Sequence, residues 1–134
     1  MLTFYSEDSR LRQARTELHD GALVTPFECP ERLDLVLKHL RHSGLGDIRA
    51  PAAYGLAPVL AVHDKAYVTF LANCWKEWQA AGHEGEAIPN IWPARTMRGD
   101  RIPQSVSGQL GYYALAAETS ISEGTFEAAM ASKD

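Results

Sequence analysis

The sequence predicts an α/β fold with a parallel sheet, and three neighbouring patterns support that prediction. Residues 1–5 are apolar or β-prone and predict a short buried strand. Residues 30–44 carry leucine and valine at helical spacing and predict an amphipathic helix, and residues 47–50 predict a second short strand. Strand, helix and strand within about fifty residues form the order that is typical of a parallel α/β layer.

The first predicted helix has clear signals at both ends. Pro30 stands where a helix begins, because its missing N–H would have no partner there. Gly44 stands where a left-handed C-terminal cap is expected, and Arg41 in the last turn suits the helix dipole. Between the first strand and this helix, residues 9–28 predict a long loop with one helical turn near residues 11–14.

The second half of the chain predicts further helices. A short helical segment is expected at residues 58–62, and a longer amphipathic helix is expected to begin after Asp64 and to end at Gly82. Its apolar stripe consists of Tyr67, Phe70, Leu71, Cys74, Trp75 and Trp78. Residues 106–119, rich in Ala and Gly, predict a closely packed helix, and residues 124–131 predict a final short helix.

Residues 83–103 predict a long insertion loop within a single domain that spans residues 1–134. The segment contains three prolines and two glycines, and it shows neither helical nor strand periodicity. Loops longer than about 15 residues are uncommon in compact domains and are often functional. We therefore expect this loop to contribute to function.

The composition is that of an ordinary globular chain. Of 134 residues, 46% are hydrophobic and 22% are charged, which suits one domain with a buried core. Thirteen basic residues against 17 acidic residues argue against a nucleic-acid partner. No run of about 18 apolar residues predicts a membrane span. Charge appears by Glu7, and Cys29 and Cys74 form no disulfide framework, so we expect a cytoplasmic location.

The motifs include no complete catalytic constellation. HExxH, CxxC, GxSxG and the phosphate-binding GxxxxGK pattern are all absent from the sequence. His39 and His42 are three residues apart, which leaves an independent metal site open. His63 precedes a predicted helix cap, so a capping or packing role is the preferred interpretation. Glu118 lies in the Ala-rich segment with few polar neighbours, which leaves a ligand-facing role open.

Three long sequence blocks carry a resemblance to a known enzyme family. They are SEDSRLRQARTELHDGALVTPFECPERL, APAAYGLAPVLAVHDKAYVTFLANCWKEWQAAGHEGEAI and RIPQSVSGQLGYYALAAETSISEGTFEAA. The more discriminating parts are TELHDGALVTPFE and RIPQSVSGQLGYYALAAET, whereas VHDKAYVTFL is of a more widespread type. The blocks cover nearly the whole chain and resemble the N-terminal third of the bacterial acetylpolyamine amidohydrolases, members of the histone deacetylase superfamily.

The resemblance implies the N-terminal part of an arginase/deacetylase-type three-layer α/β/α fold with a parallel sheet. It also implies zinc-dependent hydrolysis of the acetamide of an acetylated polyamine or a similar acetylated amine. In that chemistry the metal polarises the carbonyl and activates water, a histidine acts as base and a tyrosine supports the oxyanion. In the family these groups lie downstream of the matching region. The resemblance therefore implies no catalytic and no metal-ligating residue within residues 1–134.

The resemblance places three residues of this chain at substrate-facing positions. Glu17 and His19 fall in the loop that lines the family's active-site rim, and Glu118 falls on a glutamate that attracts the distal ammonium group. The implied partner is therefore a small cationic acetylated amine. A carboxylate that faces such a cation contributes about 1–3 kcal/mol through a charge-assisted hydrogen bond.

The predicted loop at about 83–103 falls on the family's long insertion, which helps to form a homodimer and narrows the substrate channel. The residues expected to act there are Glu84, Glu86, Trp92, Arg95 and Arg98. A homo-oligomer is therefore expected. Two positions depart from the family: His19 stands where a tyrosine is expected, and Ser107 stands where a glutamate is expected. The second departure removes an acid near the channel, so the preferred acetylated amine stays open.

Two interpretations of function follow. In the first, the chain is the N-terminal segment of a zinc-dependent deacetylase and is inactive by itself. In the alternative, it is a stand-alone, non-catalytic module for interaction or dimerisation, which would carry polar replacements where the rest of the fold packs. Residues 1–5 and the Ala-rich segment remain apolar, which favours the first interpretation.

Overall fold

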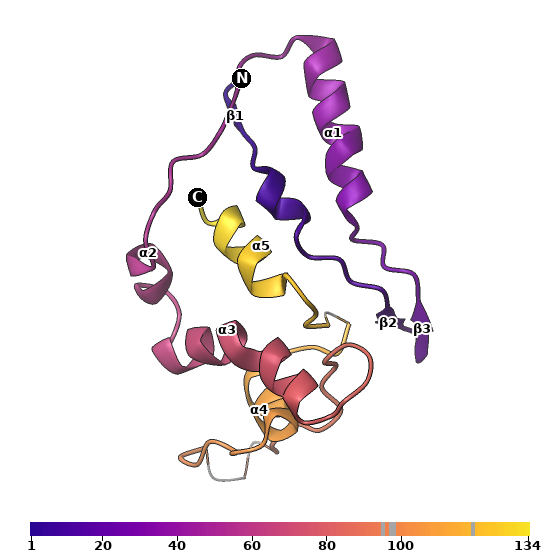
Figure 1. Ribbon diagram of the computed structural model, residues 1–134, viewed down its shortest axis with the longest axis vertical. Coiled ribbons are helices and arrows are strands. Elements are labelled where there is room, and N and C mark those ends of the chain that lie inside the picture. The colour runs from indigo at the N-terminus through magenta and orange to yellow at the C-terminus, as the bar shows by residue number, and fades with distance from the viewer. Residues whose placement is uncertain (95, 97–98, 119) are drawn as a thin grey trace.

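The computed structural model describes residues 1–94, 96, 99–118 and 120–134 (Figure 1). Arg95 and Arg98, both expected to act in the insertion loop, lie outside the described residues. The strands are β1 (Thr3–Phe4), β2 (Glu17–His19), β3 (Ala22–Val24) and β4 (Ile48–Arg49). The helices are the 3₁₀ helix η1 (Glu7–Arg10), α1 (Pro30–Ser43), α2 (Ala57–Leu60), α3 (Lys65–Ala80), α4 (Val106–Tyr113) and α5 (Thr125–Ser132).

The predicted strand–helix–strand unit is confirmed. Strands β1 and β4 pair in parallel, with Thr3 opposite Ile48, and α1 connects them along one side of the molecule (Figure 1). Helix α1 begins at Pro30 and ends before Gly44, which adopts the predicted left-handed conformation with φ of 59°. The predicted burial of the first strand is wrong for this chain, because Phe4 is 59% exposed and no second layer covers it among the described residues.

The predicted long loop over residues 9–28 instead contains a β-hairpin. Strands β2 and β3 pair antiparallel and are joined by the two-residue turn Asp20-Gly21. Both turn residues have positive φ, 48° at Asp20 and 81° at Gly21, as a type I′ hairpin turn requires. Asp-Gly is a strong hairpin signal, so the turn chemistry could have predicted this hairpin. The single turn of helix also lies earlier than predicted, in η1.

Helix α3 and the core confirm the predicted apolar stripe. Asp64 caps the helix, because its carboxylate accepts hydrogen bonds from the backbone N–H groups of Ala66 and Tyr67. The core cluster joins this helix to α4 and to the insertion loop and consists of Phe70, Cys74, Ala87, Val106 and Leu110. Burial raises the pKa of the Cys74 thiol to about 12.

Helix α4 is shorter than the segment predicted as helix. It ends at Tyr113, and Ala114 already has the extended backbone angle ψ of 137°. The indole Nε1 of Trp92 donates to the carbonyl oxygen of Ala114 at 2.9 Å, so the insertion loop supplies the partner that a further helical turn would otherwise provide. The insertion loop also lies close to the α4 backbone at Gly111. A Cβ at this position would lie 1.8 Å from the backbone oxygen of Ile91, so only glycine permits the contact.

The remaining predicted elements are also observed. Helices α2 and α5 confirm the short helices expected near residues 58–62 and 124–131. Helix α5 packs against η1, which brings the two ends of the sequence together (Figure 1). Residues 83–103, where described, form an irregular segment whose one ladder pairing joins Ala87 to Ile121. Within the described part of the chain, no helix has the length and apolar character needed to cross a bilayer.

The fold leaves an unusually large surface uncovered. Its accessible surface is 9578 Å², whereas a folded monomer of this mass exposes about 7,000 Å². Much of the uncovered surface is apolar, and it includes Leu2, Phe4, Leu35, Val36 and Val62. These side chains lie in or next to β1, on α1 and just after α2, so much of the parallel strand pair and of its connecting helix stays exposed.

Candidate functional site

The carboxylate of Glu86 joins two segments that are far apart in the sequence. Its Oε1 accepts from the backbone N–H of Arg15 at 2.6 Å. Its Oε2 accepts from the backbone N–H of Thr16 at 3.1 Å and from the Thr16 hydroxyl at 2.7 Å. The same Oε2 accepts from the hydroxyl of Ser120 at 3.1 Å. Residues 15–16 and Ser120 therefore meet at one charged group.

Helix α3 and a short ladder hold Glu86 in place. The indole Nε1 of Trp78 on α3 donates to the carbonyl oxygen of Gly85 at 3.1 Å, directly before Glu86. Directly after it, Ala87 and Ile121 exchange backbone hydrogen bonds of 2.9 and 3.0 Å. Ala87 is fully buried. Glu86 is thus fixed from both sides along its own backbone.

The hydrogen bonds keep Glu86 ionised. Burial is the largest influence and by itself raises the pKa of the carboxyl group. The donors on Arg15, Thr16 and Ser120 together outweigh it, so the pKa of Glu86 lies below its ordinary value. Glu86 is therefore an anion whose hydrogen-bonding capacity is used within the chain, and it differs from the exposed Glu84 nearby.

Glu17 and His19 lie on β2 of the hairpin. One carboxylate oxygen of Glu17 accepts from the backbone N–H of Phe27 at 3.0 Å, which ties the hairpin to the chain that follows it. The His19 ring packs edge-on against Phe27, with ring centroids 5.3 Å apart, and its Nε2 lies 3.6 Å from a carboxylate oxygen of Asp20. Both residues keep part of their surface open, as substrate-facing side chains require.

Glu118 lies outside the helix in which the sequence placed it. It is exposed, in the irregular segment that follows α4. Two residues later, Ser120 donates to Glu86, which also accepts from Thr16 next to Glu17. The segments that carry Glu17 and Glu118 are therefore brought together by Glu86.

The insertion loop contacts α3 and α4 through aromatic and polar side chains. His83 stacks on Trp78 with ring centroids 4.1 Å apart, and its Nε2 lies 3.1 Å from the Ser107 hydroxyl. Ser107, where the resemblance predicts a glutamate, is thus the neighbour of a histidine in this chain. Trp92 anchors the loop through the bond to Ala114 described above, and part of its side chain is still exposed.

A groove of about 700 Å³ lies beside the Glu86 cluster. The hydrophobic part of its lining comes from Leu11 and Trp75, and its polar part includes Thr16, Glu86 and Glu127. The groove therefore runs from α3 across residues 15–16 and 85–86 to the start of α5. Three glutamates, Glu86, Glu123 and Glu127, line it beside the cationic Arg15, and neither Glu17 nor Glu118 is among its lining residues.

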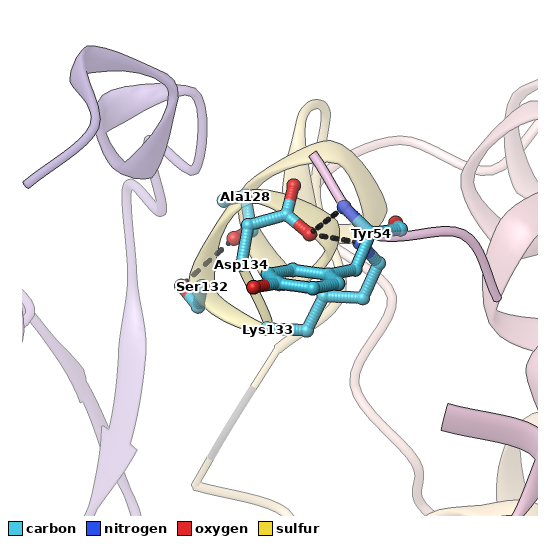
Figure 2. Close-up of polar contacts among 5 residues, drawn as sticks. All are labelled: Tyr54, Ala128, Ser132, Lys133 and Asp134. Carbon is cyan, nitrogen blue, oxygen red and sulfur yellow. Dashed lines mark hydrogen bonds and ion pairs between the residues drawn. The ribbon is translucent and has the colours of Figure 1, made fainter. Parts of the chain in front are cut away.

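A second polar cluster closes the end of α5 (Figure 2). The backbone N–H of Tyr54 donates to Asp134 Oδ1 at 2.9 Å, and the ammonium group of Lys133 donates both to that oxygen and to the Tyr54 carbonyl. The Lys133 contact, followed by the Tyr54 N–H, lowers the pKa of Asp134. Ser132 completes the helix end by donating to the carbonyl of Ala128 at 2.9 Å. These groups satisfy one another and tie the loop after β4 to α5.

The zinc ion implied by the resemblance finds no ligand set in the described residues. Three or more His, Cys, Asp or Glu side chains in metal-binding proximity occur nowhere among them. This includes His39 and His42, which lie on exposed turns of α1. His63 packs its ring against Tyr67 at 5.8 Å, and Asp64 is the residue that caps α3. Residues 1–134 as described therefore do not fit a catalytic zinc site.

Comparison with known proteins identifies the relationship. No family model matches the sequence. An acetylpolyamine amidohydrolase of Mycoplana ramosa is 49% identical over 132 residues, which is 98% of this chain and 38% of the relative. The chain is homologous to the acetylpolyamine amidohydrolases. The acetylpolyamine amidohydrolase 2 of Pseudomonas aeruginosa is 42% identical over 96% of the chain.

The structural comparison agrees with this family. A crystal structure of acetylpolyamine aminohydrolase from Burkholderia pseudomallei matches 98% of the chain with a TM-score of 0.86 and 31% identity. The predicted resemblance and the α/β fold class are therefore confirmed. The chain spans about 38% of the length of these relatives and corresponds to the N-terminal part of their sequences.

The sequence does not reveal the hydrogen-bonded cluster around Glu86, which we call the Glu86 clamp. Glu86 is expected from the resemblance to act in a dimer and channel loop, whereas in the structure its carboxylate accepts hydrogen bonds from Thr16 and Ser120 of the same chain. A contact to a second chain is not tested by the structure and stays a prediction. The local sequence indicates this cluster only weakly, through one charged residue, Glu86, between the small residues Gly85 and Ala87. Pairing across seventy residues of chain leaves no periodic pattern to detect.

Proposed function

We propose that residues 1–134 form the substrate-recognising N-terminal part of a zinc-dependent amidohydrolase that deacetylates small cationic amines. The observation that carries the proposal is the 49% identity to the Mycoplana ramosa acetylpolyamine amidohydrolase over nearly the whole chain. The hydrogen bonds of Glu86 support it, because they tie Thr16, next to Glu17, and Ser120, two residues after Glu118, to one carboxylate.

In this proposal, Glu118 attracts the ammonium group of the substrate, and Glu17 and His19 line the rim. Glu118 is exposed and Glu17 is half-buried, so each can receive a ligand. A carboxylate paired with an ammonium group in a partly desolvated site contributes about 1–3 kcal/mol to binding. The small acetylated amine is then oriented by charge at one end, with its acetamide directed away from these acids.

The hydrolytic groups are proposed to belong to the part of the family length that this chain does not span. The zinc ion, when bound, supplies Lewis-acid activation of the amide and of a water molecule. Residues 1–134 by themselves are therefore expected to show no deacetylase activity.

The insertion loop is proposed to shape the channel and to contribute to a homo-oligomer. Glu84 and Trp92 keep exposed surface available for such a contact, and Arg95 and Arg98 belong to the same segment. We place the protein in the cytoplasm. Two free cysteines, Cys29 and Cys74, support a reducing compartment.

A chimera tests the proposed function. In it, residues 1–134 replace the matching part of the Mycoplana ramosa relative, and kcat/KM is measured for an acetylated polyamine and for a neutral acetamide of similar length. The chimera should hydrolyse the acetylated polyamine. Glu118→Gln should lower kcat/KM for the cationic substrate about 5- to 150-fold and leave the neutral substrate nearly unchanged.

The control is Glu77→Gln, which removes a charge from an exposed position of α3. It should leave both substrates unaffected. A chimera that is folded and zinc-loaded yet inactive would contradict the proposed function. An equal loss on both substrates in Glu118→Gln would contradict the assigned role of that carboxylate.

A further inference from the structure

We propose that Glu86 is a positioning residue that sets the separation of the two acidic segments in the substrate site. The inference rests on the proposed function in one respect, namely that these two segments bind the substrate. The link itself rests on geometry, because one carboxylate accepts from Arg15 and Thr16 on one side and from Ser120 on the other. Glu17 and Glu118 follow and precede these donors by one and two residues.

The donors make Glu86 difficult to replace. Ser120 is 1% exposed and Thr16 is half-buried, so water has little access to the Ser120 hydroxyl when its acceptor is lost. A glutamine at this position has one acceptor oxygen and one NH₂ group. If its oxygen faces Arg15, its NH₂ faces the donors on Thr16 and Ser120. If the amide is turned over, the NH₂ faces Arg15.

The clamp is continuous with the core. Trp78 on α3 donates a hydrogen bond to the carbonyl oxygen of Gly85. Ala87, which belongs to the core cluster, pairs with Ile121. Loss of the carboxylate therefore releases Thr16 next to Glu17 and Ser120 near Glu118, while α3 and the Ala87–Ile121 ladder stay in place. This predicts a correlated loosening of two segments that otherwise lie more than one hundred residues apart in the sequence.

Hydrogen exchange of the chimera tests the clamp directly. Glu86→Gln should accelerate exchange about tenfold at the amides of Arg15 and Thr16 and also at the amide of Ser120, whereas the Ile121 amide in the ladder should change little. Two single-arm variants separate the two sides. Thr16→Val should loosen mainly segment 15–17, and Ser120→Ala should loosen mainly the backbone at position 120. Glu77→Gln is the matched control and should change neither. Loosening of one segment alone, or of neither, in Glu86→Gln would overturn the inference.

Kinetics of the same variants test the consequence for substrate. Glu86→Gln should raise KM for the acetylated polyamine about tenfold, with kcat and the neutral acetamide little changed, because the acids are displaced while the chemistry is not. Glu86→Asp keeps the charge and should recover part of the affinity. Equal losses on both substrates would show a general structural role and overturn the inference. If the unmodified chimera is inactive, the proposed function fails, and the exchange measurement still decides whether Glu86 couples the segments.

Discussion

Glu86 shows how one charged side chain can replace a larger set of packing contacts. Its carboxylate accepts hydrogen bonds from two backbone N–H groups and two hydroxyl groups, and these come from two separate segments. Hydrogen bonds to a charged acceptor are roughly twice as strong as those between neutral groups. An irregular region of the chain is therefore held by these hydrogen bonds in addition to the packing of Ala87 and Ile121 in the core.

This cluster predicts a defined pH dependence. Because the folded pKa of Glu86 lies below its ordinary value of about 4.3, its contribution to stability is present above that pH. The contribution is lost as the pH falls through the lower folded pKa. In urea unfolding of the chimera, the stability difference between Glu86→Gln and the parent should be large at pH 7 and smaller at pH 3. Glu77→Gln should show a small difference at both pH values. A difference for Glu86→Gln that does not depend on pH would contradict the role of the charge.

At the scale of elements, helix α3 packs against both the insertion loop and α4. Its stripe supplies Phe70 and Cys74 to the core, and its Trp78 holds the insertion loop. Phe70 stacks on Tyr113 of α4 with ring centroids 4.8 Å apart. The candidate site therefore depends on α3, although Glu17 and Glu118 lie on other parts of the chain.

The cap of α3 offers a direct test of this dependence. Asp64→Ala removes the acceptor for Ala66 and Tyr67 and should destabilise the chain by about 1 kcal/mol. Asp64→Ser should recover most of the loss, because serine is also a strong N-cap. The measurement is urea unfolding at pH 7. An effect of Asp64→Ala no larger than that of a surface substitution would contradict the capping role.

At the scale of the whole molecule, the uncovered apolar surface is the main feature. The accessible surface exceeds that of a typical monomer of this mass by about 2,600 Å². A standard protein–protein interface covers about 800 Å² on each partner. The excess is thus larger than the area that one partner contributes to an ordinary interface.

This surface predicts association when residues 1–134 are produced alone. Light scattering after size exclusion should give a mass above 14.8 kDa, because exposed Phe4, Leu35 and Val62 bind one another or another chain. In the chimera the same surface should be covered, which makes it the control. A clean monomer with a cooperative thermal transition would contradict this prediction and favour a stand-alone, non-catalytic module.

The local elements were predicted well from the sequence, since their signals are local. The cap residues Asp64 and Gly44 and the stripe of α3 act within a few residues of themselves, so spacing alone predicts them. The hairpin at Asp20-Gly21 also has a local signal, because Asp-Gly favours the positive φ angles of a two-residue turn. The resemblance to the amidohydrolases depended on long sequence blocks and was confirmed at 49% identity.

The sequence by itself determined the family, the strand–helix–strand unit and most helix ends, because each follows from neighbouring residues or from long matched blocks. Only the tertiary structure decided where α4 stops, that Glu118 lies outside a helix, and that Glu86 joins Thr16 to Ser120. The physical reason is distance along the chain. Trp92 ends α4 by a hydrogen bond 22 residues away, and Glu86 reaches donors 34 and 70 residues away, where no periodic pattern records the contact.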